Sequence, residues 1–346
     1  MINNIKIKNY KCFKEENISL KNLTLLTGTN SSGKSSCIQS ILFLSNFSNG
    51  SDIEEYLESL GTFEDLKNKQ INPTKIKISS LIGKKKIEFT MDKKDNIILN
   101  NDLKILNYPK NLTYLNANRA PISEVNSFSK LKNRYFGIDG RNTISYYEQH
   151  KSDIIKLIYD KSTKSTLSGQ VDFWLLFIFS IELDFTTTKI STTHTKSSYK
   201  INNIEYKPEN LGTGISYLVS ILIACLSAQK GNIIIIDNPE IHLHPKAQSK
   251  LLNFLSFISN QDIQIIIESH SDHIFNGIRK NIYLQNNSDE NNKYFLSHEN
   301  VAIHYFDNSE RTEIKIDEDG TVLNHKEGLF DQFEDDINAL LGLTWM

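Results

Sequence analysis

The sequence predicts an α/β protein in which a parallel sheet forms the centre and antiparallel strands form a second lobe. Residues 233–236 and 265–267 are wholly apolar runs that alternate with helical patterns, as expected of strands buried on both faces of a parallel sheet. Short segments of alternating apolar and polar residues within 74–99 predict the antiparallel strands. A glycine-rich turn between a predicted strand and a predicted helix is the third observation.

The first hundred or so residues predict the turn and the antiparallel lobe. Residues 5–8 and 23–27 have the pattern of strands, and 35–46 has the apolar spacing of a helix. The glycine-rich turn at 28–34 therefore joins a strand to a helix. Further strands are predicted at 74–82, 85–91 and 96–99.

From residue 111 to residue 198 the pattern changes to mixed helix and loop, with an apolar helical run at 171–183. The stretch 186–200 is rich in Thr, Ser and Lys, and it predicts a mobile surface insertion. Beyond it, helices at 216–228 and 245–259 each precede one apolar strand. We therefore expect an N-terminal lobe over 1–110, a helical and loop insertion over 111–200 and a C-terminal lobe over 201–346.

Length and charge limit the class of protein and its partners. The chain has 346 residues, enough for one large or two modest domains. Its composition, with 39% hydrophobic and 23% charged residues, excludes disordered and fibrous proteins. The net charge of −2 gives no global attraction to nucleic acid, so DNA contact needs a local patch such as the lysines at 84–86 and 93–94. Those lysines fit a solvated hairpin face better.

The chain has features typical of the cytosol. Its three scattered cysteines, Cys12, Cys37 and Cys225, fit a reducing compartment. The N-terminal residues alternate like a strand and lack the layout of a signal peptide. The longest apolar stretches, 174–181 and 217–226, fall short of the roughly 20 residues of a membrane helix. We expect a soluble, cytoplasmic protein.

The glycine-rich turn has the pattern of a phosphate-binding loop. Its backbone amides can surround the phosphates, Lys34 can reach the terminal phosphates, and the Ser35 hydroxyl can ligate Mg²⁺ at the positive end of a helix. The alternative, a chance match in a turn, is disfavoured by its position between strand and helix. The residues predicted to bind nucleotide here are Gly28, Thr29, Asn30, Ser31, Ser32, Gly33, Lys34, Ser35 and Ser36.

Two later features fit the same chemistry. Asp237 ends the apolar strand 233–236, and together with Ser35 it predicts the Mg²⁺ site. The turn containing Gly212, Thr213, Gly214 and Ser216 opens a helix and would offer unpaired amides to an anion. A second glycine turn just ahead of the acidic strand suggests that it contacts the γ-phosphate of a nucleotide held by a partner subunit. The order of motifs thus predicts a homodimer that sandwiches ATP.

Four histidines allow two interpretations. His242, His244, His270 and His273 have spacings that resemble metal ligands, and a zinc or two-metal hydrolase could be proposed from them. However, His270 follows the second apolar strand, where a γ-phosphate-sensing histidine would lie in an ATPase. We prefer the ATPase interpretation of His270.

The set of motifs resembles the ABC-type ATPase heads of the SMC, RecF and overcoming-lysogenization-defect (OLD) class. More narrowly, LGTFEDL at 60–66, YLNANR at 114–119, DNPEIHLHP at 237–245 and EGLFDQ at 327–332 resemble stand-alone bacterial AAA15/AAA21-type ATPases with a DUF3696 C-terminal segment. The resemblance runs nearly end to end. It implies an ABC-ATPase head, with a parallel-sheet nucleotide-binding core plus an antiparallel β lobe, and with the insertion standing where relatives carry their arm. It also implies ATP and Mg²⁺ as cofactors.

Two departures from the family pattern bear on activity. The usual signature has serine after its leucine, whereas Gly212 follows Leu211 here. The usual acid pair at the strand end is Asp then Glu, but the second residue is Asn238, which cannot accept a proton from the attacking water. Glu240 is the nearest candidate for the general base, so the predicted catalytic set is Asp237, Asn238, Glu240 and His270. We expect slow ATP hydrolysis.

Three functions compete at this stage. The resemblance implies an ATP-gated dimeric switch or scaffold that regulates a separately encoded effector in anti-phage defence. A RecF-like clamp that binds DNA directly is the alternative, and DNA as a partner and assembly beyond a dimer stay open. A metal-dependent hydrolase that uses the histidines is the third. The C-terminal segment 327–342 is either a docking surface or a helix that packs on its own head.

Overall fold

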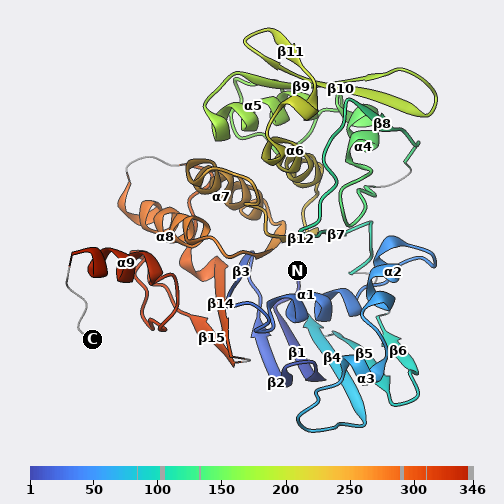
Figure 1. The fold of residues 1–346 in the computed structure, drawn as a ribbon, viewed down its shortest axis with the longest axis vertical. Helices are drawn as coiled ribbons and strands as arrows, with labels where there is room; N and C mark the ends of the chain where they lie inside the picture. The colour runs from blue at the N-terminus through green and yellow to red at the C-terminus, as the bar shows by residue number, and fades with distance from the viewer. Residues whose placement is uncertain (84, 102–105, 132–133, 289–291, 309, 342–346) are drawn as a thin grey trace.

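The computed structural model describes residues 1–83, 85–101, 106–131, 134–288, 292–308 and 310–341, with the side chains of 332–335 excepted. Lys84 of the predicted lysine patch and the last residue of segment 327–342 lie outside this part. The central element is a six-stranded sheet with the strand order β15-β14-β3-β13-β12-β7 (Figure 1). All its neighbouring pairs are parallel except β14 with β15. Its strands are β3 (Leu23–Gly28), β7 (Leu112–Leu115), β12 (Ile233–Asp237), β13 (Gln264–Glu268), β14 (Val301–Asp307) and β15 (Glu310–Ile314).

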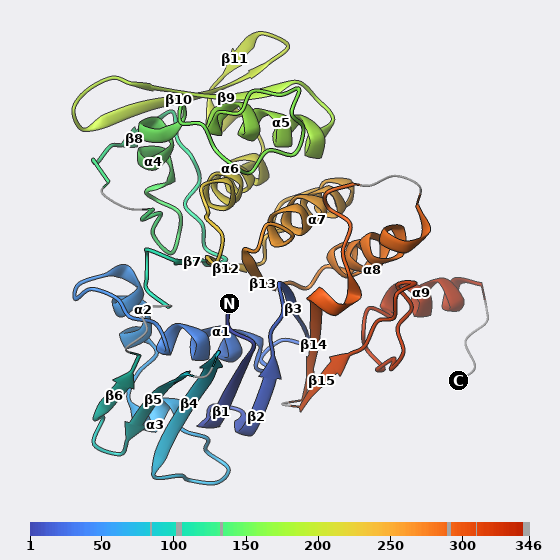
Figure 2. The same cartoon turned by 180° about the vertical axis from the view of Figure 1, so that it is seen from behind.

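The apolar runs of the sequence are buried on both faces of this sheet, as predicted. Ile234, Ile236, Ile265 and Ile267 face one hydrophobic cluster together with the helices of the C-terminal half. Their neighbours in sequence face a second cluster with α1 and the N-terminal strands. Figure 2 shows these two layers on opposite sides of the sheet. The helices are α1 (Lys34–Phe43), α2 (Asp52–Ser59), α3 (Phe63–Leu66), α4 (Thr143–His150), α5 (Leu167–Phe179), α6 (Thr213–Leu226), α7 (Pro245–Ser259), α8 (Asp272–Asn287) and α9 (Gln332–Leu340), with 3-10 turns at Pro208–Asn210 and His298–Asn300.

The N-terminal lobe is a five-stranded antiparallel sheet with the order β2-β1-β4-β5-β6. Its strands are β1 (Asn4–Tyr10), β2 (Phe13–Ser19), β4 (Lys75–Ile82), β5 (Lys85–Asp92) and β6 (Ile97–Asn100). The predicted strands of this lobe are confirmed within one or two residues. Strand β2 was not predicted, because its sequence FKEENIS has too few apolar residues to mark an alternation.

The sequence predicted a mobile surface insertion over 186–200 and no strands within it, and on the strands it is wrong. Strands β9 (Leu183–Lys189) and β10 (His194–Ile201) pair antiparallel there, and with β8 (Val125–Ser127) and β11 (Ile204–Tyr206) they form a third sheet at the far end of the molecule (Figure 1). Leu183, Phe185 and Thr187 alternate inward along β9, and Thr favours strands as well as loops. The predicted helix at 171–183 is likewise shifted to α5, which ends where Ser180 adopts a left-handed conformation.

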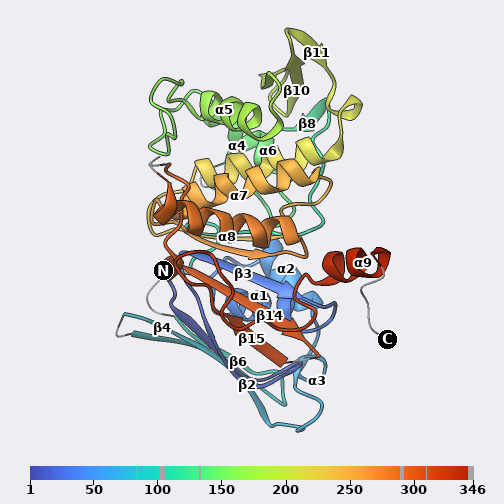
Figure 3. The ribbon, with the colours of Figure 1, turned by 90° about the vertical axis from the view of Figure 1, so that its left-hand side faces the viewer.

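The C-terminal segment packs on the head through residues that precede its helix. Leu329 is buried, and the ring of Phe330 packs on that of Phe275 in α8. Beyond these residues, α9 projects from the body of the molecule in Figure 3. Its Leu340 is 84% exposed. In the described ranges, no helix has the length and apolar character required to cross a membrane.

Candidate functional site

The phosphate loop is shaped by backbone conformations that favour glycine. Gly28 and Gly33 have φ of 129° and 122°, and Ser31 has φ of 60°. Gly28 lies against β14: a Cβ at this position would stand 1.9 Å from the carbonyl oxygen of Phe306. The Thr29 amide donates a hydrogen bond to the same oxygen at 3.0 Å. The loop is therefore fixed by the neighbouring strand as well as by its own sequence.

Lys34 and Ser35 start helix α1 directly after the loop. Lys34 is only 3% exposed, and its Nζ donates hydrogen bonds to the carbonyls of Gly28 and Thr29 at 3.1 and 2.6 Å. Burial lowers the pKa of this amine. Thr29, Asn30, Ser31 and Ser35 are exposed, and Ser36 is half-buried, whereas Ser32 and Gly33 are buried. The predicted helix start at Ser35 is thus one residue late, and the loop presents one exposed face to a ligand.

Asp237 is the last residue of β12. This strand pairs with β13, which in turn pairs with β3, the strand that leads into the phosphate loop. Its Oδ2 accepts a hydrogen bond of 2.7 Å from the Tyr114 hydroxyl on β7, while its buried Oδ1 has no hydrogen-bond partner among the described residues. Burial, and then repulsion from Glu268, raises the pKa of Asp237 to about 7. A buried carboxylate oxygen without a donor is suited to a cation, so the residues present fit Mg²⁺.

Glu268 is a site residue that the sequence reasoning missed. It ends β13 in direct register with Asp237 on β12, and it is 6% exposed. The Ser35 hydroxyl lies 3.1 and 3.0 Å from its two carboxylate oxygens. Burial raises the pKa of Glu268 against the lowering effect of the Ser35 hydrogen bond and of Lys34. An acidic residue at the end of a buried strand, in the same pattern as Asp237, was the signal that could have identified it.

The loops after β12 and β13 are joined through Glu240. Its Oε1 accepts hydrogen bonds from the Ser269 hydroxyl at 2.7 Å and from the His270 amide at 3.2 Å. Glu240 is 9% exposed, and burial raises its pKa. The His270 side chain is exposed; partial burial, and then Lys34, lowers its pKa. The structure thus brings Glu240, His270 and the start of the phosphate loop together.

Arg119 determines the shape of the loop that contains Asn238. Its guanidinium is 2% exposed and donates to the carbonyls of Asp237 and Asn238, both at 2.7 Å. Asn238 itself has φ of 43°, a left-handed conformation that Asn tolerates better than most residues. Both terminal nitrogens of Arg119 therefore bind backbone carbonyls, while its buried Nε has no hydrogen-bond partner among the described residues. The sequence alone did not decide between this position and a phosphate contact.

The second glycine turn is only partly accessible. Helix α6 begins at Thr213 rather than at Ser216 as predicted. Gly212 and Thr213 are exposed, and a Cβ on Gly212 would meet no atom within 4 Å. In contrast, Gly214 is buried against the carbonyl of His242, and Ser216 is 3% exposed. Of the predicted residues in this turn, Gly212 and Thr213 are the ones that a partner could reach.

Two of the four histidines have structural contacts instead of a shared site. His244 caps α7, where its Nδ1 accepts from the Lys246 amide at 3.3 Å, and the ring of His242 packs near that of Tyr217. Within the ranges given above, no three His, Cys, Asp or Glu side chains group closely enough to hold a metal ion.

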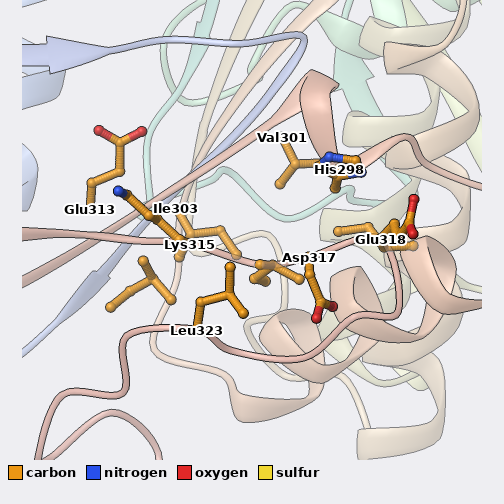
Figure 4. Close-up of a pocket in the computed structure, with 11 residues that line it drawn as sticks. His298, Val301, Ile303, Glu313, Lys315, Asp317, Glu318 and Leu323 are labelled. Atoms are coloured by element: carbon orange, nitrogen blue, oxygen red, sulfur yellow. The ribbon is translucent and has the colours of Figure 1, made fainter.

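Two cavities differ in their relation to this site. A small one beside the phosphate loop is lined by Thr27, Gly28, Thr29, His270, Tyr305, Gly328 and Phe330. A larger one of about 500 Å³ lies between the end of α8 and the β14–β15 hairpin (Figure 4). The larger cavity contains no residue predicted to bind nucleotide, so its volume alone does not mark the functional site.

Comparison with known proteins identifies the class. Residues 23–276 match the family AAA_21, described as "AAA domain, putative AbiEii toxin, Type IV TA system", and residues 296–340 match DUF3696, a protein family of unknown function. Among curated proteins, none matches the chain.

Solved structures share the fold at low sequence identity. A crystal structure of an Smc head bound to the C-winged helix domain of ScpA is 11% identical, with a TM-score of 0.57 over 96% of this chain and 99% of that chain. An Smc head domain with an extended coiled coil, bound to the C-terminal domain of ScpA derived from Pyrococcus furiosus, is also 11% identical, with a TM-score of 0.55 over 99% of both chains. The predicted family is confirmed: the chain belongs to the AAA_21 family, and it shares the fold of Smc head domains.

Proposed function

We propose that the protein is an ATP-gated dimeric switch that hydrolyses ATP slowly and regulates a separately encoded effector. The observation that carries this proposal is the meeting of the phosphate loop, Asp237 and His270 at one edge of the sheet, while the Gly212 turn is exposed and open to another molecule. In a closed dimer, the Gly212 turn of one subunit would contact the γ-phosphate bound by the other.

Within one subunit, Lys34 would bind the terminal phosphates, and Ser35 and Asp237 would hold Mg²⁺. The ion would neutralise charge on the phosphates. The exposed loop residues would donate backbone amides to the phosphates at the positive end of α1. His270 would contact the γ-phosphate from the end of β13.

Slow hydrolysis follows from the loop after β12. The amide of Asn238 cannot take a proton from water, and Glu240 reaches the site only through the Ser269 and His270 contacts. We propose Glu240 as the general base. Because a general base that reaches the site only indirectly would prolong the ATP-bound state, the closed dimer would persist long enough to signal.

A two-variant experiment tests the dimeric switch. The wild type should dimerise on adding a non-hydrolysable ATP analogue with Mg²⁺, as measured by light scattering. Lys34→Ala removes charge-assisted contacts and should weaken analogue binding about tenfold or more. Gly212→Arg adds bulk to an exposed turn away from the phosphate loop, so it should bind the analogue normally and stay monomeric. If Lys34→Ala and the wild type bind the analogue with equal affinity and have the same molar mass in solution, the proposal is refuted.

Single-turnover kinetics test the catalytic assignment. Glu240→Gln should slow hydrolysis about 10²-fold or more, whereas Asn238→Glu should accelerate it. Since a Glu at φ of 43° is strained, Asn238→Asp is the second variant, because Asp tolerates this conformation better. Fast wild-type hydrolysis that Glu240→Gln leaves unchanged would contradict both the slow switch and Glu240 as base.

A role in anti-phage defence is supported by the family description, which names a toxin of a toxin-antitoxin system. The effector is proposed as a protein that binds the ATP-closed dimer. Affinity purification of the tagged wild type and of Gly212→Arg should recover it only with the wild type. Recovery with both variants would show that binding does not depend on closure.

A further inference from the structure

Glu268 is the buried acid of the site that the proposed mechanism does not yet use. It projects from the end of β13, which lies between the phosphate-loop strand β3 and the Asp237 strand β12. Its carboxylate is therefore placed between the two groups proposed to hold Mg²⁺, and the contacts around it show what it can bind.

The closest group to Glu268 is the proposed metal ligand Ser35. The hydroxyl oxygen of Ser35 lies 3.1 and 3.0 Å from the two oxygens of the Glu268 carboxylate. Neighbouring ligands of an octahedral Mg²⁺, each about 2.1 Å from the ion, stand about 3.0 Å apart. The Ser35 and Glu268 oxygens thus already have the separation of adjacent ligands of one ion.

The other polar groups nearby leave Glu268 available. Lys34 directs its hydrogen bonds to the carbonyls of Gly28 and Thr29. Asp237 accepts a hydrogen bond of 2.7 Å from the Tyr114 hydroxyl through Oδ2, so Oδ1, which has no partner in the described part of the chain, is the oxygen left for a cation. Two carboxylates in register on adjacent strands repel each other at close range, and a divalent cation between them would remove this repulsion.

We propose that Glu268 is a ligand of the Mg²⁺ ion, so that this ATPase holds the metal through Ser35, Asp237 and Glu268. This inference rests on the proposed binding of Mg²⁺ and ATP and adds a residue to that site. One or two carboxylates together with phosphate oxygens and water make up the usual Mg²⁺ shell in nucleotide enzymes. The second carboxylate raises the affinity for the metal at the cost of stronger repulsion in its absence.

Metal binding, measured apart from turnover, tests this assignment. Mn²⁺ serves as the probe, because it prefers the same oxygen ligands and its binding can be followed by electron paramagnetic resonance. Titrations use the full chain with a saturating non-hydrolysable ATP analogue, and analogue affinity is also measured in EDTA. Glu268→Gln should weaken Mn²⁺ binding about tenfold or more. In EDTA, its analogue affinity should equal or exceed that of the wild type, since a negative charge near the phosphates is gone.

The controls separate the possible failures. Asp172→Asn removes a half-buried carboxylate on α5, outside the proposed metal site, and should leave Mn²⁺ binding unchanged. Glu268→Asp retains the charge but shortens the side chain, so a partial loss of Mn²⁺ affinity is expected even if Glu268→Gln does not fold. Mn²⁺ affinity equal to wild type in the folded Glu268 variants would overturn this inference alone. A wild type that binds no analogue, with or without metal, would overturn the proposed function and this inference together.

Discussion

Gly28 and Gly212 both belong to predicted nucleotide-binding turns, yet their backbones differ. Gly28 has φ of 129° and no room for a Cβ, whereas Gly212 has φ of −60° and open space around it. The conformation of Gly28 is available to glycine at little cost and is strained for other residues. Glycine is therefore required at Gly28 because the fold leaves no room for a side chain. At Gly212 the fold itself leaves room, so a requirement for glycine there would come from the partner subunit or nucleotide that contacts this turn.

A pair of alanine substitutions should separate these requirements. Gly28→Ala should lower the thermal stability clearly and abolish ATP binding, because the methyl group would collide with the Phe306 carbonyl. Gly212→Ala should change the free energy of unfolding by no more than about 0.5 kcal/mol. Calorimetry and analogue titration measure both effects. Equal stability of the two variants would contradict the tight packing of β14 on the loop.

Asp172 is a half-buried acid on α5, outside the candidate nucleotide site, and it should make stability depend on pH. Burial raises its pKa to about 7, although a hydrogen bond from the Phe185 amide acts in the opposite direction. An unfolded Asp ionises near pH 4, so between about pH 4 and pH 7 the folded chain holds a proton that the unfolded chain has lost. The stability from this group is complete below about pH 4 and is lost as the pH rises through 7.

Asp172→Asn should therefore flatten the fall in melting temperature between pH 5 and pH 8 and raise the melting temperature at pH 8. The free energy of unfolding of the wild type should fall with pH more steeply than that of the variant, by at most about 1.4 kcal/mol per pH unit. Asn retains the oxygen that accepts from Phe185, so the contact itself is conserved. If the melting temperatures of variant and wild type change with pH in the same way across this range, Asp172 is already ionised in the folded protein.

At the scale of elements, the loop after β12 depends on one arginine. Arg119 donates to three backbone carbonyls, those of Asn116, Asp237 and Asn238. A lysine cannot reproduce the forked geometry of a guanidinium. Arg119 thus fixes the backbone that follows Asp237, and the position of Asn238 is set by this contact rather than by its own side chain.

Arg119→Lys should lower the free energy of unfolding by about 1–3 kcal/mol, because buried carbonyls lose their donors. Urea denaturation measures the change. The exposed Arg141, which pairs with Asp139, provides the matched control, and Arg141→Lys should stay within about 0.5 kcal/mol of the wild type. A similar small effect at both positions would argue against a structural role for Arg119.

The elements with strong local signals could be predicted from the sequence, and those defined by distant partners could not. The phosphate loop, β12 and α7 have periodic apolar residues and end signals of their own, such as Pro245 at the first turn of α7. Glu268 has the local signal of an acid at a strand end, but its contact with Ser35, 233 positions away in sequence, could not be predicted from that signal. The same applies to the pairing of β14 with β3, since a parallel neighbour leaves no mark in either strand's own pattern.

At the scale of the whole molecule, the described part of the chain contains three sheets with different positions and roles. The central sheet positions the site, the antiparallel lobe covers one face of it, and the sheet of β8, β9, β10 and β11 lies at the far end beyond α6 (Figure 1). The extents of the three predicted parts stay a prediction. However, β7 lies within the range 111–200 and yet is an edge strand of the central sheet. Chain order and spatial division therefore differ at this point.

The parallel pairing of β14 with β3 has a consequence for how the protein is made. The strand that leads into the phosphate loop is synthesised early, but its neighbour at 301–307 leaves the ribosome much later. A nascent chain that stops at residue 300 should fail to bind an ATP analogue, and adding a peptide of residues 301–341 should restore binding in part. The ability to capture nucleotide would then report that β14 has been synthesised and has paired with β3, so that copies truncated before β14 would not bind ATP.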